Sequence, residues 1–136
     1  MKKGITFGAF DVLHAGHCLM LEEARQQCDF LIVGLHRDPS VAPKEYRGKV
    51  KNAPIQSLEE RFIQITSNRN VDEVIIYDTE EDLHKILLDK KPDIRIIGSD
   101  WKGKKFTGWD LPMEIFYNSR NHSYSSTELR ERIKKS

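Results

Sequence analysis

The stretch Gly8-Ala9-Phe10-Asp11-Val12-Leu13-His14-Ala15-Gly16-His17 decides how the fold of this chain is interpreted. It lies between a short apolar run, residues 5–7, and a helical apolar pattern that begins near Ala15, so we predict a turn from a first strand into a first helix. A helix N-terminus presents unpaired backbone N–H groups and the positive end of the helix dipole. Gly8 and Gly16 allow a ligand to approach the backbone closely. The turn therefore suits a phosphate group.

His14 and His17 are three residues apart, so on a helix they share a face. Two imidazoles beside free N–H groups form a tunable cationic site, which suits a polyphosphate better than a hydride or an acyl group. Two other interpretations stay open from these residues. With Asp11 they could be zinc ligands, although Cys18 points away from their face, or they could be a structural pair. The spacing is neither that of a Walker A loop nor that of a dinucleotide fingerprint.

Length and composition describe one ordinary domain over residues 1–136, long enough to build a core. The net charge of +1 gives no reason to expect nucleic acid as a partner. No apolar run is long enough to span a membrane, and residues 1–4 lead directly into a strand, so we expect no membrane segment and no secretory signal. Cys18 and Cys28 are ten residues apart on one helix, too far to bridge, and are predicted to be reduced core thiols of a cytoplasmic protein.

Strand and helix patterns alternate along the chain. Strands are predicted at residues 5–7, 30–35, 73–77, 94–97 and 114–117, and helices at 15–27, 57–68, 80–90 and 125–134. The run at 30–35 is apolar almost throughout, which is typical of a parallel strand buried on both faces. Alternation of this kind predicts right-handed crossovers, and the expected fold is an α/β, doubly wound parallel sheet.

Helix ends and buried faces are predicted from capping residues and periodicity. Ser57-Leu58-Glu59-Glu60 and Ser125-Ser126-Thr127-Glu128 both read as capping boxes. On the first helix we expect an apolar stripe of Leu19, Met20, Leu21 and Ala24, with Cys18 and Met20 in the core. On the second helix the expected buried stripe is formed by Leu58, Phe62 and Ile65.

Residues 36–56 are too long for an ordinary connection. They hold three prolines and the basic residues Lys44, Arg47, Lys49 and Lys51, and they follow the carboxyl end of a strand, where ligands bind in open α/β sheets. We predict a basic lid over the site. The alternative is a solvated basic loop.

A second anion site is predicted in the C-terminal segment 119–127. Ser125, Ser126 and Thr127 open the last helix, and Arg120 lies just upstream. Hydroxyl groups, a helix N-terminus and a guanidinium together suit the β- and γ-phosphates of a nucleotide. The alternative is that Ser125 only caps the helix.

These motifs carry a family resemblance. The His-x-Gly-His element after Gly-x-Phe-Asp resembles the signature of the nucleotidyltransferases that make CDP-alcohols, ADP-sugars, NAD and coenzyme A precursors. The segment Gly98-Ser99-Asp100-Trp101-x-Gly103 is similar to the Gly-Asp-Asp-Trp-x-Gly of the glycerol-3-phosphate cytidylyltransferases. The helix-opening residues 58–61 and the C-terminal residues 120–127 extend the resemblance over nearly the whole chain, in the same order.

The resemblance implies a Rossmann-like enzyme that moves CMP from CTP to a phosphorylated alcohol, with glycerol 3-phosphate the leading acceptor, Mg²⁺ held mainly by the nucleotide phosphates, and a homodimer. Together with the residue patterns it assigns catalysis to His14, His17, Lys44 and Arg120, nucleotide binding to Gly8, Ala9, Phe10, Asp11, Gly16, Asp100, Arg120, Ser125, Ser126 and Thr127, and acceptor binding to Lys44 and Arg61. Ala9 departs from the hydroxyl residue that the family often has, and the long lid leaves the basic partner of Lys44 open. The alternatives are an adenylyltransferase of the same fold, acting on a sugar phosphate or phosphopantetheine, and a nucleotide-binding protein without catalysis.

Overall fold

Residues 1–41, 52–120 and 122–136 are described by a computed structural model. Five strands form one sheet in the order β3-β2-β1-β4-β5, and every neighbouring pair is parallel. The strands are β1 (Lys3–Gly8), β2 (Phe30–His36), β3 (Glu73–Tyr77), β4 (Ile94–Gly98) and β5 (Glu114–Asn118). The predicted α/β parallel sheet is confirmed.

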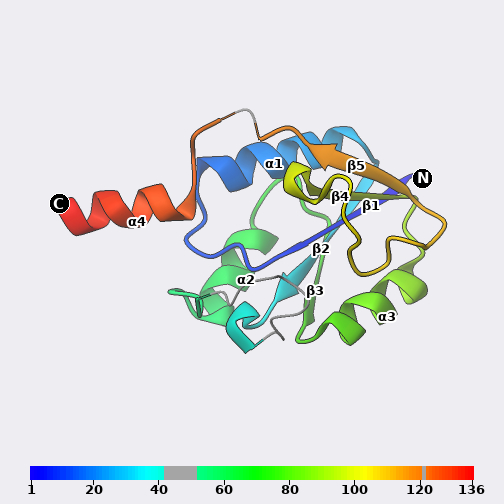
Figure 1. Ribbon diagram of the computed structural model, residues 1–136, viewed down its shortest axis with the longest axis horizontal. Helices are drawn as coiled ribbons and strands as arrows, with labels where there is room; N and C mark the ends of the chain where they lie inside the picture. Colours follow the sequence, from blue (N-terminus) through cyan, green and yellow to red (C-terminus); the bar gives the residue numbers. More distant parts are fainter. Residues whose placement is uncertain (42–51, 121) are drawn as a thin grey trace.

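Helices cover both faces of the sheet (Figure 1). They are α1 (Ala15–Gln26), α2 (Leu58–Thr66), α3 (Glu80–Lys90) and α4 (Ser126–Lys135), close to the predicted ranges. Chain order explains their placement, because β1, β2 and β3 are added in one direction and β4 returns to the other side of β1. With right-handed crossovers, α1 and α2 share one face and α3 lies on the other, while α4 extends away from the sheet (Figure 1).

Two apolar clusters confirm this division of faces. Leu31, Val33 and Leu35 of β2 are fully buried in one cluster, with residues of α1 and α2. Ile32 alternates with them and packs in the second cluster, which contains residues of α3. Burial on both faces explains why β2 is apolar almost throughout.

Several predicted buried positions on the helices are wrong. Cys18 is exposed, and Leu19 and Phe62 are 45% and 38% exposed. On α1 the buried stripe is set by Leu21 and Ala24, so Cys18 and Leu19 fall beside it. On α2 the polar residue Arg61 points inward in place of Phe62.

The strand order reverses between β1 and β4, which is where ligands bind in folds of this type. The connection after β1 leads to α1 on one face. The connection after β4 instead runs through a short 3-10 turn, Ser99–Trp101, and a loop to β5. The two connections diverge and leave a crevice at the carboxyl edge of the sheet.

The predicted lid has structure at both described ends. A 3-10 turn spans Pro39–Val41, and the backbone N–H groups of Ile55 and Gln56 bind the carboxylate of Asp11. The predicted loop is therefore anchored to the turn after β1. Lys44, Arg47, Lys49 and Lys51 lie outside the described residues.

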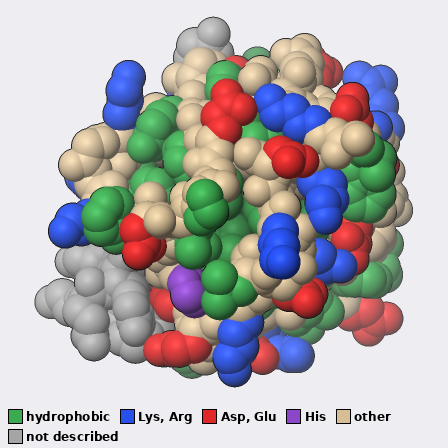
Figure 2. All heavy atoms as spheres, turned by 90° about the vertical axis from the view of Figure 1, so that its right-hand side faces the viewer, with side chains coloured by type: hydrophobic (Ala, Val, Ile, Leu, Met, Phe, Trp, Pro, Cys, Tyr) green, Lys and Arg blue, Asp and Glu red, His purple; other side chains and the backbone are tan. Residues whose placement is uncertain are grey.

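The surface carries both signs of charge. On the face in Figure 2, acidic and basic side chains are interspersed, with apolar side chains between them. In the described ranges 1–41, 52–120 and 122–136, none of the helices combines the length and apolar character needed to cross a bilayer.

Candidate active site

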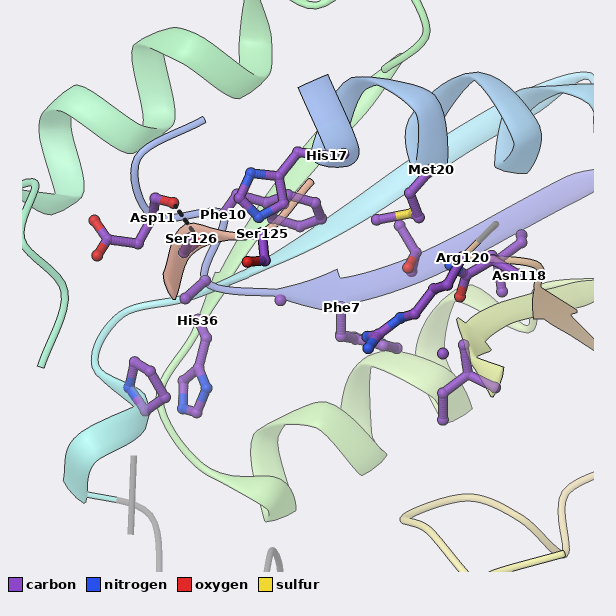
Figure 3. A pocket seen from close by; sticks show the side chains of 18 of the residues that line it. Phe7, Phe10, Asp11, His17, Met20, His36, Asn118, Arg120, Ser125 and Ser126 are labelled. Atoms are coloured by element: carbon purple, nitrogen blue, oxygen red, sulfur yellow. Dashed lines mark hydrogen bonds between the residues drawn. The ribbon is translucent and has the colours of Figure 1, made fainter. Parts of the chain in front are cut away.

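A cavity of about 850 Å³ opens at the carboxyl ends of β1 and β4. Its walls come from the turn after β1, the start of α1, the ends of β4 and β5, and the segment that leads into α4 (Figure 3). Ligand sites in proteins commonly have volumes of about 300–1,000 Å³. The cavity therefore has room for a nucleotide, and it joins the two anion sites predicted from the sequence.

The turn after β1 is strained and firmly held. Phe10 and Val12 both adopt a left-handed backbone with φ of 50°, which costs a non-glycine residue about 1–3 kcal/mol. The Val12 N–H donates to Oε1 of Gln56 at 2.8 Å. The Asp11 carboxylate accepts from the backbone N–H groups of Ile55 and Gln56 at 2.8 and 2.9 Å. The segment that enters α2 thus fixes the conformation of the turn.

Asp11 also joins the turn to α4. Its carboxylate is only 11% exposed and lies 3.0 Å from Nη2 of Arg130, and the Ser126 hydroxyl donates to its backbone oxygen at 3.5 Å (Figure 3). The side chain predicted to contact nucleotide is therefore engaged by protein donors. Within the described part of the chain, no three His, Cys, Asp or Glu residues are grouped so that they could hold a metal ion.

The two histidines cap the first turn of α1. Nδ1 of His14 accepts from the Gly16 N–H at 3.0 Å, and Nδ1 of His17 accepts from the His14 N–H at 3.3 Å. Because both Nδ1 atoms accept, each neutral ring carries its proton on Nε2. The rings stack with centroids 3.8 Å apart. The three-residue spacing thus serves the cap, and it leaves two Nε2–H donors.

The site is less cationic than the sequence suggested. Burial lowers the pKa of His17 to about 4, with a further decrease from His14 and a partial increase from Asp11. Burial, followed by the nearby His122, also lowers the pKa of His14. At neutral pH, without ligand, His17 is therefore a neutral hydrogen-bond donor. This corrects the predicted cationic pair.

Gly16 is required by the imidazoles around it. A Cβ atom at this position would lie 2.9 Å from Cε1 of His14 and 2.9 Å from Cε1 of His122. His122 is a third imidazole at the start of α1, and its Nδ1 accepts from the Tyr124 N–H at 3.2 Å. The sequence placed His122 in the C-terminal anion segment but gave it no role of its own, because nothing local indicates that it reaches His14.

Arg120 and Asp100 come together although they are twenty positions apart. Nη2 of Arg120 lies 3.8 Å from Oδ1 of Asp100, with both side chains more than half exposed. A Cβ at Gly98 would lie 2.5 Å from that carboxylate oxygen and 2.9 Å from that nitrogen. Arg120, which has a φ of 48°, and Trp101 line the cavity. The two predicted ligand-binding segments therefore form one wall.

The serines before α4 combine capping with a place on the cavity wall. Ser125 accepts from the Glu128 N–H at 3.0 Å, which is the serine half of the predicted capping box. Ser125, Ser126 and Thr127 all line the cavity. The Ser125 hydroxyl accepts the capping bond and can still donate to a phosphate oxygen, whereas the Ser126 hydroxyl already donates to the Asp11 oxygen.

Arg61, predicted to bind the acceptor, is buried and is not among the residues that line the cavity. It is 2% exposed, and its guanidinium donates to four backbone oxygens: Gln56 at 3.2 Å, Ala9 at 3.1 Å, His36 at 2.7 Å and Arg37 at 2.6 Å. These bonds compensate for burial of the charge and tie α2 to the ends of β1 and β2. The sequence could not reveal this, because the four carbonyls converge only in the fold.

The remaining predicted residues of the turn, Gly8, Ala9 and Phe10, all line the cavity, and Phe10 also packs in the core. A Cβ at Gly8 would lie 3.1 Å from the Phe10 ring. Phe10 is 5% exposed, and its ring packs in the core 5.4 Å from the ring of His17. The Phe10 ring thus packs against the His17 ring from the side of the core. Lys44, predicted to be catalytic and to bind acceptor, lies outside the described residues.

Comparisons with known proteins agree with this geometry. The sequence model of the cytidylyltransferase-like family matches residues 5–132. The chain is 35% identical over 133 residues to a glycerol-3-phosphate cytidylyltransferase of Bacillus subtilis, with 98% of each chain covered. It is 37% identical over 135 residues to the bifunctional protein HldE of Campylobacter concisus, of which it spans 28% while 98% of this chain is covered.

Solved structures agree on the fold. A lipopolysaccharide core biosynthesis protein from Thermoplasma volcanium superposes with a TM-score of 0.59 at 27% identity, covering 99% of this chain and 88% of that one. Fold, turn and similarity together define a nucleotidyltransferase. The chain belongs to the cytidylyltransferase-like family.

Proposed function

We propose that this chain transfers the CMP group of CTP to a small phosphorylated alcohol, with glycerol 3-phosphate as the leading acceptor, and releases pyrophosphate. The observation that carries the proposal is the pair of Nε2–H donors at the N-terminus of α1, in the same cavity as Arg120 and the α4 serines. The full-length similarity to a glycerol-3-phosphate cytidylyltransferase supports the choice of nucleotide and acceptor.

In the proposed reaction, a phosphate oxygen of the acceptor attacks the α-phosphorus of CTP. A new P–O bond forms, the bond to the β-phosphate breaks, and the electron pair leaves with pyrophosphate. His14 and His17 donate to the oxygens on which negative charge grows, together with backbone N–H groups of the turn. Such fixed donors, at a site shielded from water, are the main source of rate enhancement in phosphoryl chemistry.

Mg²⁺ would accompany the triphosphate, bound mainly through the nucleotide's own oxygens, and would neutralise part of its charge. The chain's own donors fit this arrangement. The imidazole Nε2–H groups and the Arg120 guanidinium match phosphate oxygens, whereas the Asp11 carboxylate is engaged by Arg130 and backbone N–H groups.

The proposed function is tested by pyrophosphate release with CTP, ATP and UTP against a panel of phosphorylated alcohols. We expect CTP with glycerol 3-phosphate to give the highest kcat/KM, and His17→Ala to reduce kcat about a hundred- to a thousandfold. Preference of the wild type for ATP would instead support the adenylyltransferase alternative. Near-normal turnover of His17→Ala would remove the proposed role of the histidines.

Base selection is proposed to involve Asp100, whose Oδ1 lies 3.8 Å from Nη2 of Arg120, a residue that lines the cavity. A carboxylate can accept from the exocyclic amine of cytosine, which UTP lacks, so UTP should be a very poor substrate. Asp100→Asn should narrow the CTP-to-UTP ratio of kcat/KM. If the CTP-to-UTP ratio of kcat/KM in Asp100→Asn equals that of the wild type, Asp100 does not select the base and only positions Arg120.

The proposal includes a homodimer, which the family resemblance implies. Light scattering after size-exclusion chromatography should give twice the 15.8-kDa mass of the chain. A monomeric mass at micromolar concentrations and full activity would contradict it.

A further inference from the structure

A buried arginine on the opposite face of the sheet from the histidines has no role in the proposed chemistry so far. Arg95 lies in β4 between Ile94 and Ile96, and its partners in register are Ile5 on β1 and Ile115 on β5. It is 5% exposed and lines the cavity. The neighbouring residues Ile94 and Ile96 are apolar, and an apolar side chain would also suit position 95. The presence of a charged side chain there therefore needs an explanation.

The guanidinium of Arg95 is held between two aromatic rings. Its central carbon lies 5.0 Å from the centre of the Phe7 ring and 5.0 Å from that of Phe106, and Nη1 donates to the Thr107 oxygen. Phe7 itself is held in place by close contact with Gly34, where a Cβ would lie only 2.2 Å from the ring. Two cation–π contacts stabilise a desolvated cation without using its in-plane N–H donors.

One of these donors is unsatisfied. Among residues 1–41, 52–120 and 122–136, the buried Nε of Arg95 has no hydrogen-bond partner and no acidic side chain forms an ion pair with the guanidinium. Burial lowers the pKa of Arg95 to about 10, although the charge of Glu80 partly opposes this decrease, so the group remains cationic at neutral pH. A buried cation with a free donor is costly unless a ligand completes it.

The place of Arg95 within the cavity indicates which ligand that is. The histidines and the α4 serines, which suit the nucleotide phosphates, lie around the N-terminus of α1. Arg95 alternates with Ile94 and Ile96, which pack toward α1, so it lies on the α3 face. There Leu83 and the rings of Phe7, Tyr77 and Phe106 line the same cavity. This half of the cavity is left for the second substrate.

We propose that Arg95 is a specificity-determining residue for the acceptor: its guanidinium donates a hydrogen bond to an oxygen, a hydroxyl or a carboxylate, at the end remote from the attacking phosphate. This rests on the proposed function, in which an acceptor phosphate attacks the nucleotide. A cationic pocket of this kind selects oxygen-ended acceptors and repels ammonium-ended ones of similar size.

The wild type provides the first test. Pyrophosphate release is measured with CTP and four acceptors: glycerol 3-phosphate, 3-phosphoglycerate, ethanolamine phosphate and choline phosphate. We expect one or both of the oxygen-ended acceptors to exceed both ammonium-ended ones by at least about tenfold in kcat/KM. The better of the first two identifies a hydroxyl or a carboxylate as the group that Arg95 binds. Equal use of ethanolamine phosphate overturns the proposal without any variant.

Two variants provide the second test. Arg95→Met keeps the length of the side chain and removes every donor, and Arg95→Lys keeps the charge but loses Nε. Both should raise the KM for the preferred acceptor, by about 10- to 100-fold for Arg95→Met, and leave the KM for CTP within about twofold. The matched control is Lys105→Met, which removes an exposed cation from the ring of Trp109 outside the cavity and should change neither KM.

The outcomes separate the two proposals. Normal turnover by the wild type, together with an unchanged acceptor KM in the folded variants, overturns the role of Arg95 alone. An equal rise in both KM values also overturns it, since that result indicates general disruption of the site. If the wild type releases no pyrophosphate from CTP or ATP with any acceptor, the proposed function and the inference fail together.

Discussion

His17 is held as a neutral imidazole, and this has a consequence for stability. Its pKa is about 4 in the folded chain and about 6.5 when unfolded, so the unfolded state binds more protons between these values. The contribution of neutral His17 to the free energy of unfolding is therefore fully present above pH 6.5 and is lost as the pH falls toward 4. Between pH 7 and pH 5 this residue should lower the free energy of unfolding by about 2 kcal/mol.

His17→Gln removes the titrating group, so its unfolding free energy should fall less between pH 7 and pH 5 than that of the wild type. Urea titrations at the two pH values measure this difference. His84→Gln is the control, because His84 lies on α3 and is not among the residues that line the cavity. A pH dependence in His17→Gln equal to that of the wild type would contradict the assignment.

Arg61 is a second residue whose environment defines its role. Arg61→Met leaves four backbone oxygens without their donor, so we expect a loss of about 2–4 kcal/mol in the free energy of unfolding. Arg61→Lys should not restore it, because an ammonium cannot reach carbonyls arranged around a planar fork. Arg69→Met is the control: its side chain is 85% exposed, and the change should stay within about 0.5 kcal/mol. If Arg61→Met instead had the stability of the wild type and a raised KM for the acceptor, Arg61 would be an acceptor-binding residue.

Among the elements, α4 depends on a small contact for its position. None of its residues is buried, and it extends away from the sheet (Figure 1). The ion pair between Arg130 and Asp11 and the bond from Ser126 join it to the turn after β1. Because Ser125, Ser126 and Thr127 line the cavity, loosening α4 should weaken nucleotide binding more than it weakens the fold.

We therefore expect Arg130→Met to raise the KM for CTP about tenfold, with a smaller effect on the acceptor KM. Arg132→Met is the matched control on the same helix, because Arg132 is 64% exposed and pairs only with Glu128 among the described residues. Steady-state kinetics of the two variants measure the KM values for CTP and for the acceptor. Equal KM values for CTP in both would show that the contact with Asp11 does not position α4.

The elements were predictable from the sequence because their signals are local. Ser57 with Glu60 caps α2, as the capping box predicts, and alternation of strands and helices is enough to predict a parallel sheet. The His-x-Gly-His turn was likewise predicted at the start of α1. What sequence reasoning missed depends on contacts between distant segments. The Phe106 ring covers the guanidinium of Arg95, which lies eleven positions earlier in the chain. The ring of His122 lies beside Gly16, far from it in the sequence.

At the scale of the whole molecule, the cavity joins segments from both ends of the chain. Its walls include residues from the segments 8–17, 95–101, 118–120 and 122–130, so a nucleotide bound there links the turn, β4 and α4. Ligand that binds only the folded state stabilises it by about 2.7 kcal/mol at 100 times its Kd. For a chain of this length that corresponds to a rise in Tm of roughly 10 °C.

We therefore predict that CTP with Mg²⁺ raises the Tm by about this amount at 100 times its Kd, and that cytidine at the same concentration has little effect. The reason is that the donors of the cavity, the two imidazoles, the start of α1 and Arg120, match phosphate oxygens. Differential scanning fluorimetry of the full chain with CTP, cytidine and no ligand measures this directly. Comparable shifts from CTP and cytidine would mean that the base, and not the triphosphate, dominates binding, which would contradict the assignment of the α1 N-terminus as the phosphate site.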